Sequence, residues 1–159
     1  GMIPIISYNY GAQKPDRMKR TMKLGVMVGC SIMVFCLAIM QVFPGQILKI
    51  FDATDEMLLM GIPAVRIMST AFIFAGFSVT CSGMFQAVGK GVYSMIVSMA
   101  RQLFVILPVA YFLSKAMNSV NGVWAAFPIA EVFSVIISTI FLLRVYKKIV
   151  KPMESVQRD

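Results

Sequence analysis

Long apolar runs, each long enough to cross a lipid bilayer as a helix, constrain the fold of this chain more than any other feature. The four runs cover residues 24–43, 67–89, 92–114 and 123–143. The first two contain no charged residue, the third is interrupted only by Arg101 and Gln102, and the fourth carries one acid, Glu131. About 20 apolar residues in helical form span the hydrocarbon core. The sequence therefore predicts an all-α, polytopic membrane protein with four transmembrane helices.

Composition excludes several classes of protein. Apolar residues make up 58% of the chain and charged residues only 14%, which is unlike a soluble or a disordered protein. The absence of histidine removes most zinc sites and most imidazole acid–base chemistry. The three cysteines, Cys30, Cys36 and Cys81, lie inside apolar runs without a CxxC pattern, so we interpret them as small buried apolar side chains. We expect no metal, no cofactor and no enzymatic activity.

The distribution of charge predicts the orientation in the membrane. Ten of the fifteen basic residues fall on one side of the predicted spans: Lys14, Arg17, Lys19, Arg20, Lys23, Lys90, Arg144, Lys147, Lys148 and Lys151. Basic residues near span ends mark the cytoplasmic side. We therefore expect residues 1–23 to hold a basic cytoplasmic loop and residues 144–159 to form a basic cytoplasmic tail of a plasma-membrane protein. Anionic lipid headgroups, rather than nucleic acid, are the expected partners of these charges.

The first eleven residues, GMIPIISYNYG, start apolar and turn polar. This pattern is typical of the last turns of a transmembrane helix, so we expect the chain to be a piece of a longer protein.

Four short motifs suggest a family. The run PIISYNYGA begins at Pro4 and includes Tyr8, Asn9, Tyr10 and Gly11. The other motifs are FQAVG at 85–89, Arg101 followed by Pro108, and GVW at 122–124 followed by FPIAE at 127–131. In this order they resemble motifs of the MATE (multidrug and toxic compound extrusion) transporters, and the resemblance covers essentially the whole chain.

The resemblance implies a fold and a function. It implies part of the C-terminal lobe of a twelve-helix transporter: the end of helix eight, then helices nine to twelve. Such transporters export drug-like, often cationic, compounds by proton or sodium antiport. The implied partners are the lipid bilayer, the missing N-terminal lobe and a small-molecule substrate. Some branches carry a carboxylate within helix ten, but residues 67–89 contain none. We therefore expect the coupling acid to lie outside this segment.

Polar side chains recur at helical spacing inside three of the predicted spans. The stripes are Ser78, Ser82 and Gln86; Ser94, Ser98 and Gln102; and Glu131, Ser134 and Ser138. Residues at this spacing share one helix face. They either line a substrate cavity open to the cytoplasm or form hydrogen bonds between helices, each worth roughly 0.6 kcal/mol. The candidates for the cavity or polar network are Ser78, Ser82, Gln86, Ser98, Gln102 and Ser134.

Arg101 and Glu131 are predicted to form an ion pair within the membrane. From the cytoplasmic ends of their spans, Arg101 lies about 14 Å deep and Glu131 about 18 Å deep at 1.5 Å per residue. Either charge alone costs roughly 2.5–3.5 kcal/mol at such a depth. The alternatives are that each residue faces water in a cleft, or that Glu131 is protonated.

Other classes of function fit the sequence less well than the transporter. A flippase for lipids or polysaccharide precursors needs a wide basic cavity, and within the spans only Arg101 provides positive charge. A non-transporting four-helix membrane subunit has no evident need for Arg101 and Glu131. Gly25 and Gly29 form a GxxxG pair, which favours close packing within one bundle over a dimer face.

Overall fold

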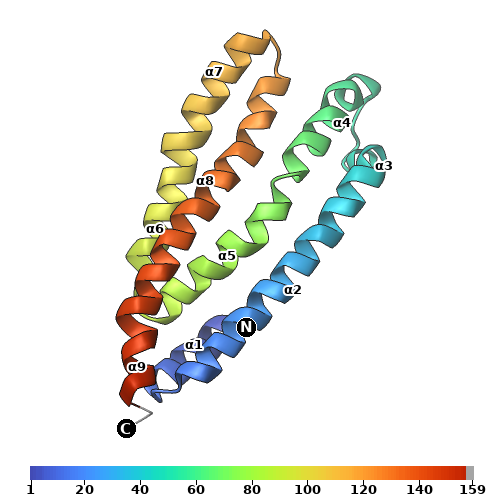
Figure 1. Cartoon of the computed structure of the whole chain (residues 1–159). Coiled ribbons are helices and arrows are strands. Elements are labelled where there is room, and N and C mark those ends of the chain that lie inside the picture. The colour runs from blue at the N-terminus through green and yellow to red at the C-terminus, as the bar shows by residue number, and fades with distance from the viewer. Residues whose placement is uncertain (157–159) are drawn as a thin grey trace.

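The computed structural model describes residues 1–156, which form helices joined by short turns (Figure 1). In chain order the elements are α1 (Met2–Gly11), α2 (Pro15–Val42), α3 (Pro44–Ile50), α4 (Asp55–Ser69), α5 (Phe72–Ala87), α6 (Gly91–Met99), η1 (Ala100–Ile106), α7 (Leu107–Met117), α8 (Asn121–Val145), η2 (Tyr146–Val150) and α9 (Lys151–Val156). The elements η1 and η2 are π-helices. No strand occurs in residues 1–156, so the predicted all-α fold is confirmed.

Three continuous helices in the described part of the chain are long and apolar enough to cross a membrane. They are Pro15–Val42, Gly91–Met117 and Asn121–Ser155. A fourth span arises if α4 and α5, which are bent by 52° at their junction, count as one. Figure 1 shows this bent pair between α2 and α8.

The bend is where the structure differs most from the predicted span 67–89. That span contains only the end of α4, and the chain is already helical from Asp55. At the break the Thr70 N–H bonds to Ile67 O rather than to Arg66 O. The released Arg66 carbonyl accepts from Gln41 Nε2 at 2.8 Å and from Ser69 Oγ at 3.1 Å, and Thr70 Oγ1 adds a bond to Ile67 O at 2.7 Å. Because a released carbonyl in lipid needs a partner, these bonds stabilise the bent form.

The segments predicted to be a cytoplasmic loop and a cytoplasmic tail contain helix. The basic stretch before residue 24 is largely helical, because α2 begins at Pro15, a residue suited to the first turn of a helix. The predicted tail is helical as far as Val156. Residues 157–159 of that tail lie outside the described residues.

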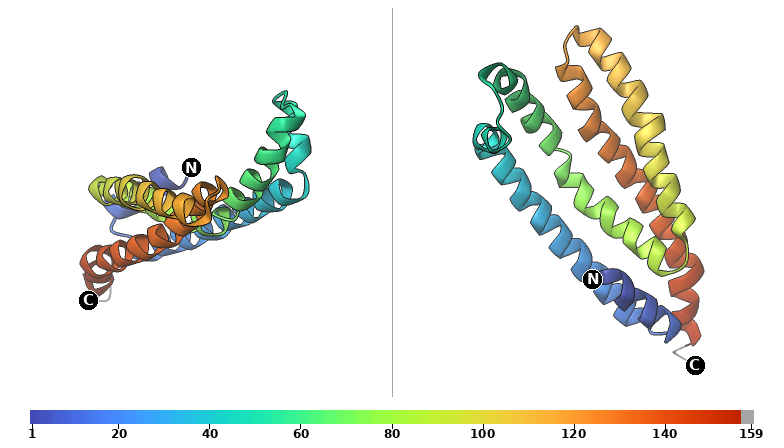
Figure 2. Two further views of the ribbon diagram at one scale, coloured as in Figure 1. Left: turned by 90° about the horizontal axis from the view of Figure 1, so that it is seen from above. Right: turned by 180° about the vertical axis from the view of Figure 1, so that it is seen from behind.

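The helix α5 holds the bundle together, because it contacts both α2 and α8 (Figure 2). Its contact with α2 is made by small residues. A Cβ built on Gly76 would lie 3.0 Å from Cys30 Cα, and one built on Gly29 would lie 3.1 Å from Thr80 Oγ1. The GxxxG pair of α2 therefore packs within this bundle.

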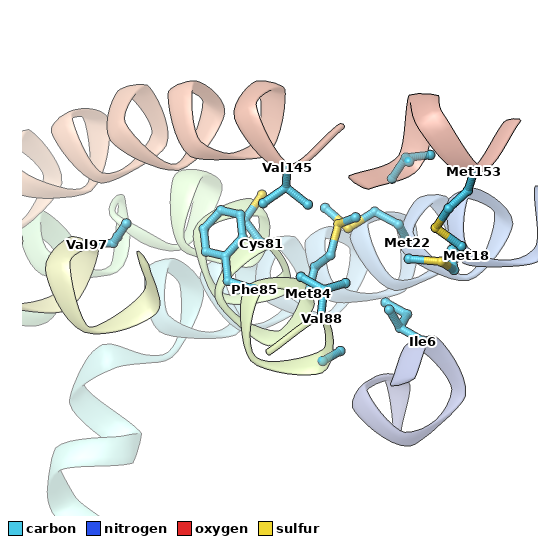
Figure 3. Close-up of a cluster of buried hydrophobic side chains, with 12 residues drawn as sticks. Ile6, Met18, Met22, Cys81, Met84, Phe85, Val88, Val97, Val145 and Met153 are labelled. Atoms are coloured by element: carbon cyan, nitrogen blue, oxygen red, sulfur yellow. The ribbon is translucent and has the colours of Figure 1, made fainter. Parts of the chain in front are cut away.

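A buried apolar cluster joins α1, α2, α5, α8 and α9 at the end of the molecule that carries α9 (Figure 3). Phe85, Met18 and Ile6 are fully buried in it. At the adjacent surface, Lys19 Nζ contacts Glu154 Oε1 at 2.7 Å and Asp16 Oδ1 at 2.9 Å. The hydrogen bond to Glu154, and then that to Asp16, raises the pKa of Lys19 above its ordinary value. A lysine is already charged at neutral pH, so the raised pKa matters only in alkaline solution: the contacts of Lys19 weaken as the pH rises through that pKa.

Candidate functional site

Arg101 and Glu131 meet in the middle of the bundle. Arg101 Nη1 donates a hydrogen bond to Glu131 Oε1, and the two side chains are 30% and 10% exposed. Two charges in such surroundings attract each other more strongly than they would in water. The structure thus brings together the two residues that the depth estimate placed at similar levels.

The backbone on either side explains how the pair is positioned. Arg101 lies in η1, which ends at Ile106, two residues before Pro108. Pro108 has no N–H to bond with the carbonyl of Phe104. The wider turns of a π-helix accommodate this break, and π-helices are frequent at functional sites. A turn with Asn118 in the left-handed conformation, at φ 44°, then returns the chain so that α8 packs against η1.

An apolar cavity of about 400 Å³ lies on one side of the pair. We define it by its lining residues: Met40, Val65, Met68, Ser69, Ala71, Phe72, Ala75, Arg101, Gln102, Ile106, Phe127 and Glu131. The bend between α4 and α5 forms one wall, and η1 and α8 form the opposite wall. Gln102 lies here, apart from the other predicted members of its stripe.

A polar cavity of about 300 Å³ lies on the other side of Arg101. Its lining residues are Ile3, Ser78, Val79, Ser82, Gly83, Gln86, Ser94, Val97, Ser98 and Arg101. Gln86 and Ser98 are exposed at its rim, whereas Ser78 is buried. Four of the six predicted cavity residues, Ser78, Ser82, Gln86 and Ser98, therefore lie around one space. Among the described residues, Arg101 alone lines both cavities.

Ser134 does not join either set of lining residues. It is 1% exposed, and its hydroxyl has no hydrogen-bond partner within residues 1–156. Its neighbour on the same helix face, Ser138, is also buried. In α8 this face packs into the bundle, so of its three predicted polar residues only Glu131 lines one of the two cavities described here.

No residue of the PIISYNYGA motif lines either cavity, although Ile3, directly before the motif, lines the polar cavity. The motif covers most of α1 and continues into the turn after it. Pro4, Tyr8 and Gly11 are exposed, and Tyr10 is partly buried. Asn9 is buried: its Nδ2 donates to Ile5 O, and its backbone carbonyl accepts from the Lys14 N–H. Ser7 Oγ donates to Ala87 O at 2.9 Å, which fixes α1 to the end of α5. These contacts give the motif a structural role at the turn into α2.

Arg101, Gln102 and Glu131 were predicted from the sequence, but the other residues that shape the apolar cavity were missed. Gln41 Nε2 also donates to Ser69 Oγ at 3.1 Å, so it joins the end of α2 to the bend that lines the cavity. The signal available in the sequence was Gln41 itself, a polar residue near the end of the first apolar run. No group of three or more metal-ligating side chains suited to a metal ion occurs in the described part of the chain.

Comparison with known proteins gives consistent matches. The sequence model of the MatE family matches residues 1–112. Multidrug export protein MepA of Staphylococcus haemolyticus is 26% identical over 125 residues, covering 79% of this chain and 27% of MepA. The solved structure of the MATE multidrug transporter DinF-BH has 32% identity and a TM-score of 0.81, covering 94% of this chain and 33% of that chain.

A further solved structure, an inward-facing conformation of a MATE family multidrug resistance transporter, shares the fold. Its TM-score is 0.85 at 18% identity, and it covers 97% of this chain and 35% of that chain. The present chain thus spans about a third or less of the length of these relatives. The relatives are transporters, not enzymes.

Proposed function

Because the chain belongs to the MatE family, we propose that it forms part of the C-terminal lobe of a secondary active multidrug efflux transporter. The complete protein exports drug-like, often cationic, compounds in exchange for protons or sodium ions. The observation that carries this proposal is the family match over residues 1–112, supported by the similarity to MepA and DinF-BH.

In this proposal the two cavities belong to the transport machinery. Secondary transporters work by alternating access, in which two units rock about a site at their interface. The apolar cavity extends towards Met40 and Val65, and the polar cavity extends towards Gln86 and Ser94 beside the α5–α6 turn. Arg101, held by Glu131, lines both cavities and in this proposal is the barrier between them.

We place the α9 end of the molecule in the cytoplasm of a plasma-membrane protein. The contact between Lys19 and Glu154 supports this, because it brings the basic stretches of α2 and of the C-terminal segment to the same end. Large apolar side chains such as Phe35, Phe104 and Phe112 are exposed in this chain. In the complete transporter they face lipid or the remaining lobe.

The chain alone is expected to transport nothing, because it supplies only part of one lobe. Proteoliposomes are prepared with either this chain or the complete transporter that carries it. Efflux of ethidium, a cationic dye, is then followed after a pH or a sodium gradient is imposed. The complete transporter is expected to export ethidium under one of the two gradients. Liposomes that contain only this chain are expected to lose ethidium no faster than empty liposomes.

An uncoupler that collapses the gradient is the control for passive leakage. If the complete protein moves ethidium under neither gradient, multidrug antiport is ruled out for this dye. If the isolated chain drives efflux, the second lobe is not required.

A further inference from the structure

We propose that the polar cavity binds an oxyanion, a carboxylate or a phosphate group, through the guanidinium of Arg101 and the hydroxyls that surround it. The proposal concerns binding alone and stands whether or not the chain takes part in transport. The volume of the polar cavity, about 300 Å³, lies at the lower end of the range for known small-molecule sites.

The side chains around the cavity are rich in hydrogen-bond donors. Its hydroxyls belong to Ser78, Ser82, Ser94 and Ser98. Gln86 Nε2 donates to Ser94 Oγ at 3.2 Å, which directs the proton of that hydroxyl elsewhere. The hydroxyl of Ser78 is buried and has no partner within residues 1–156. A buried donor without a partner costs free energy, and an acceptor group placed in the cavity removes that cost.

The charges around the cavity favour an anion. Glu131 lines the apolar cavity, and no acidic residue is among the described residues that line the polar cavity. Arg101 therefore presents positive charge to the polar cavity, and its negative partner lies on the far side. Lys90, in the turn between α5 and α6, adds positive charge at the end where Gln86 and Ser94 lie.

Arg101 also has donors to spare. A guanidinium has five N–H groups, and the structure shows one hydrogen bond from this one, through Nη1 to Glu131. Arg101 Nε and Glu131 Oε2 are both buried without a partner in the described part of the chain, so the donors free for a ligand are the remaining N–H groups on Nη1 and Nη2. Hydrogen bonds from arginine to carboxylate or phosphate are among the strongest in proteins. An oxyanion thus satisfies Arg101 in a way that a neutral amide does not.

The apolar part of the lining defines the rest of the ligand. Ile3, Val79 and Val97 lie beside the hydroxyl groups. The cavity therefore suits a small molecule with an anionic group at one end and an apolar body at the other. A soluble aromatic acid and the phosphate of an anionic lipid share this chemistry.

The experiment measures binding of benzoate, phenyl phosphate and benzamide by calorimetry to the full 159-residue chain in phosphatidylcholine nanodiscs. Benzamide is the neutral counterpart of benzoate. We expect both anions to bind at least about tenfold more tightly than benzamide, as expected for one hydrogen bond to a charged group. A second set of nanodiscs contains phosphatidylglycerol. Both sets are measured in about 1 M salt, which screens the negative surface potential of phosphatidylglycerol. Benzoate binding that is still weaker there identifies a lipid headgroup as the occupant, and unchanged binding identifies a soluble anion.

Variants locate the site. The double variant Arg101→Gln/Glu131→Gln leaves no unpaired charge and is expected to lose the preference for benzoate over benzamide. Ser98→Ala is expected to weaken benzoate binding several-fold. Ser114→Ala is the matched control, because the Ser114 hydroxyl bonds to Tyr111 O in its own helix and lines neither cavity. Circular dichroism verifies that each variant is folded. Equal binding of benzoate and benzamide, or a preference retained by the double variant, overturns the proposal.

Discussion

Replacing Glu131 with Gln is expected to destabilise the bundle by about 3–5 kcal/mol, because it leaves Arg101 charged and unpaired within the membrane. Arg101→Gln is expected to cost less. A guanidinium left without its partner stays charged, because arginine is not deprotonated in proteins. The double variant Arg101→Gln/Glu131→Gln leaves no charge and is expected to recover at least half of the loss caused by Glu131→Gln.

These losses of stability are measured by unfolding the three variants in mixed micelles of increasing SDS fraction. Circular dichroism monitors the unfolding. Residues in contact give a double-mutant cycle with a coupling energy, and independent residues give losses that add. If the loss in the double variant equals the sum of the two single losses, Arg101 and Glu131 do not stabilise each other.

Gly76→Val is expected to have the second-largest effect, about 3 kcal/mol, because it forces α2 away from α5. A Cβ at position 76 would lie 3.0 Å from Cys30 Cα and 3.1 Å from Cys30 N. These are backbone atoms, so the strain is relieved only by separating the helices. The same unfolding measurement detects this loss.

Gly91→Val is the matched control, because a Cβ at Gly91 would meet nothing within 4 Å. We expect its unfolding transition to lie close to that of the parent chain. If Gly76→Val and Gly91→Val are equally stable, the close contact between α2 and α5 contributes little to the bundle.

The features that were predictable from the sequence are those that depend on position along one helix. Hydropathy predicts the membrane fold, because the bilayer requires apolar runs of a set length. Helical spacing places Ser78, Ser82 and Gln86 on one face of α5, and the structure collects all three around the polar cavity. Depth along the helix puts Arg101 and Glu131 at similar levels, and they meet.

The features that were not predictable depend on contacts between distant residues. The bend after Ser69 has neither proline nor glycine at its two turn residues, Thr70 and Ala71, and it is fixed by Gln41 from another helix. Whether Ser134 lines a cavity or is buried between helices depends on how α8 is rotated against its neighbours, and helical spacing alone does not reveal this rotation. The extent of α9 likewise follows from burial of Met153 in the core rather than from its own sequence.

One measurement decides whether Arg101 and Glu131 separate two cavities that open on opposite sides of the membrane. Cys30, Cys36 and Cys81 are first replaced by alanine, and single cysteines are then placed at Ser98 in the polar cavity and at Ala75 in the apolar cavity. An impermeant thiol reagent is applied to right-side-out and to inside-out vesicles. We expect labelling at position 98 only from the cytoplasmic side and at position 75 only from the outside, whereas with Arg101→Ala/Glu131→Ala both positions become reactive from either side. If both positions react from the same side while Arg101 and Glu131 are intact, the pair is not the barrier between the cavities.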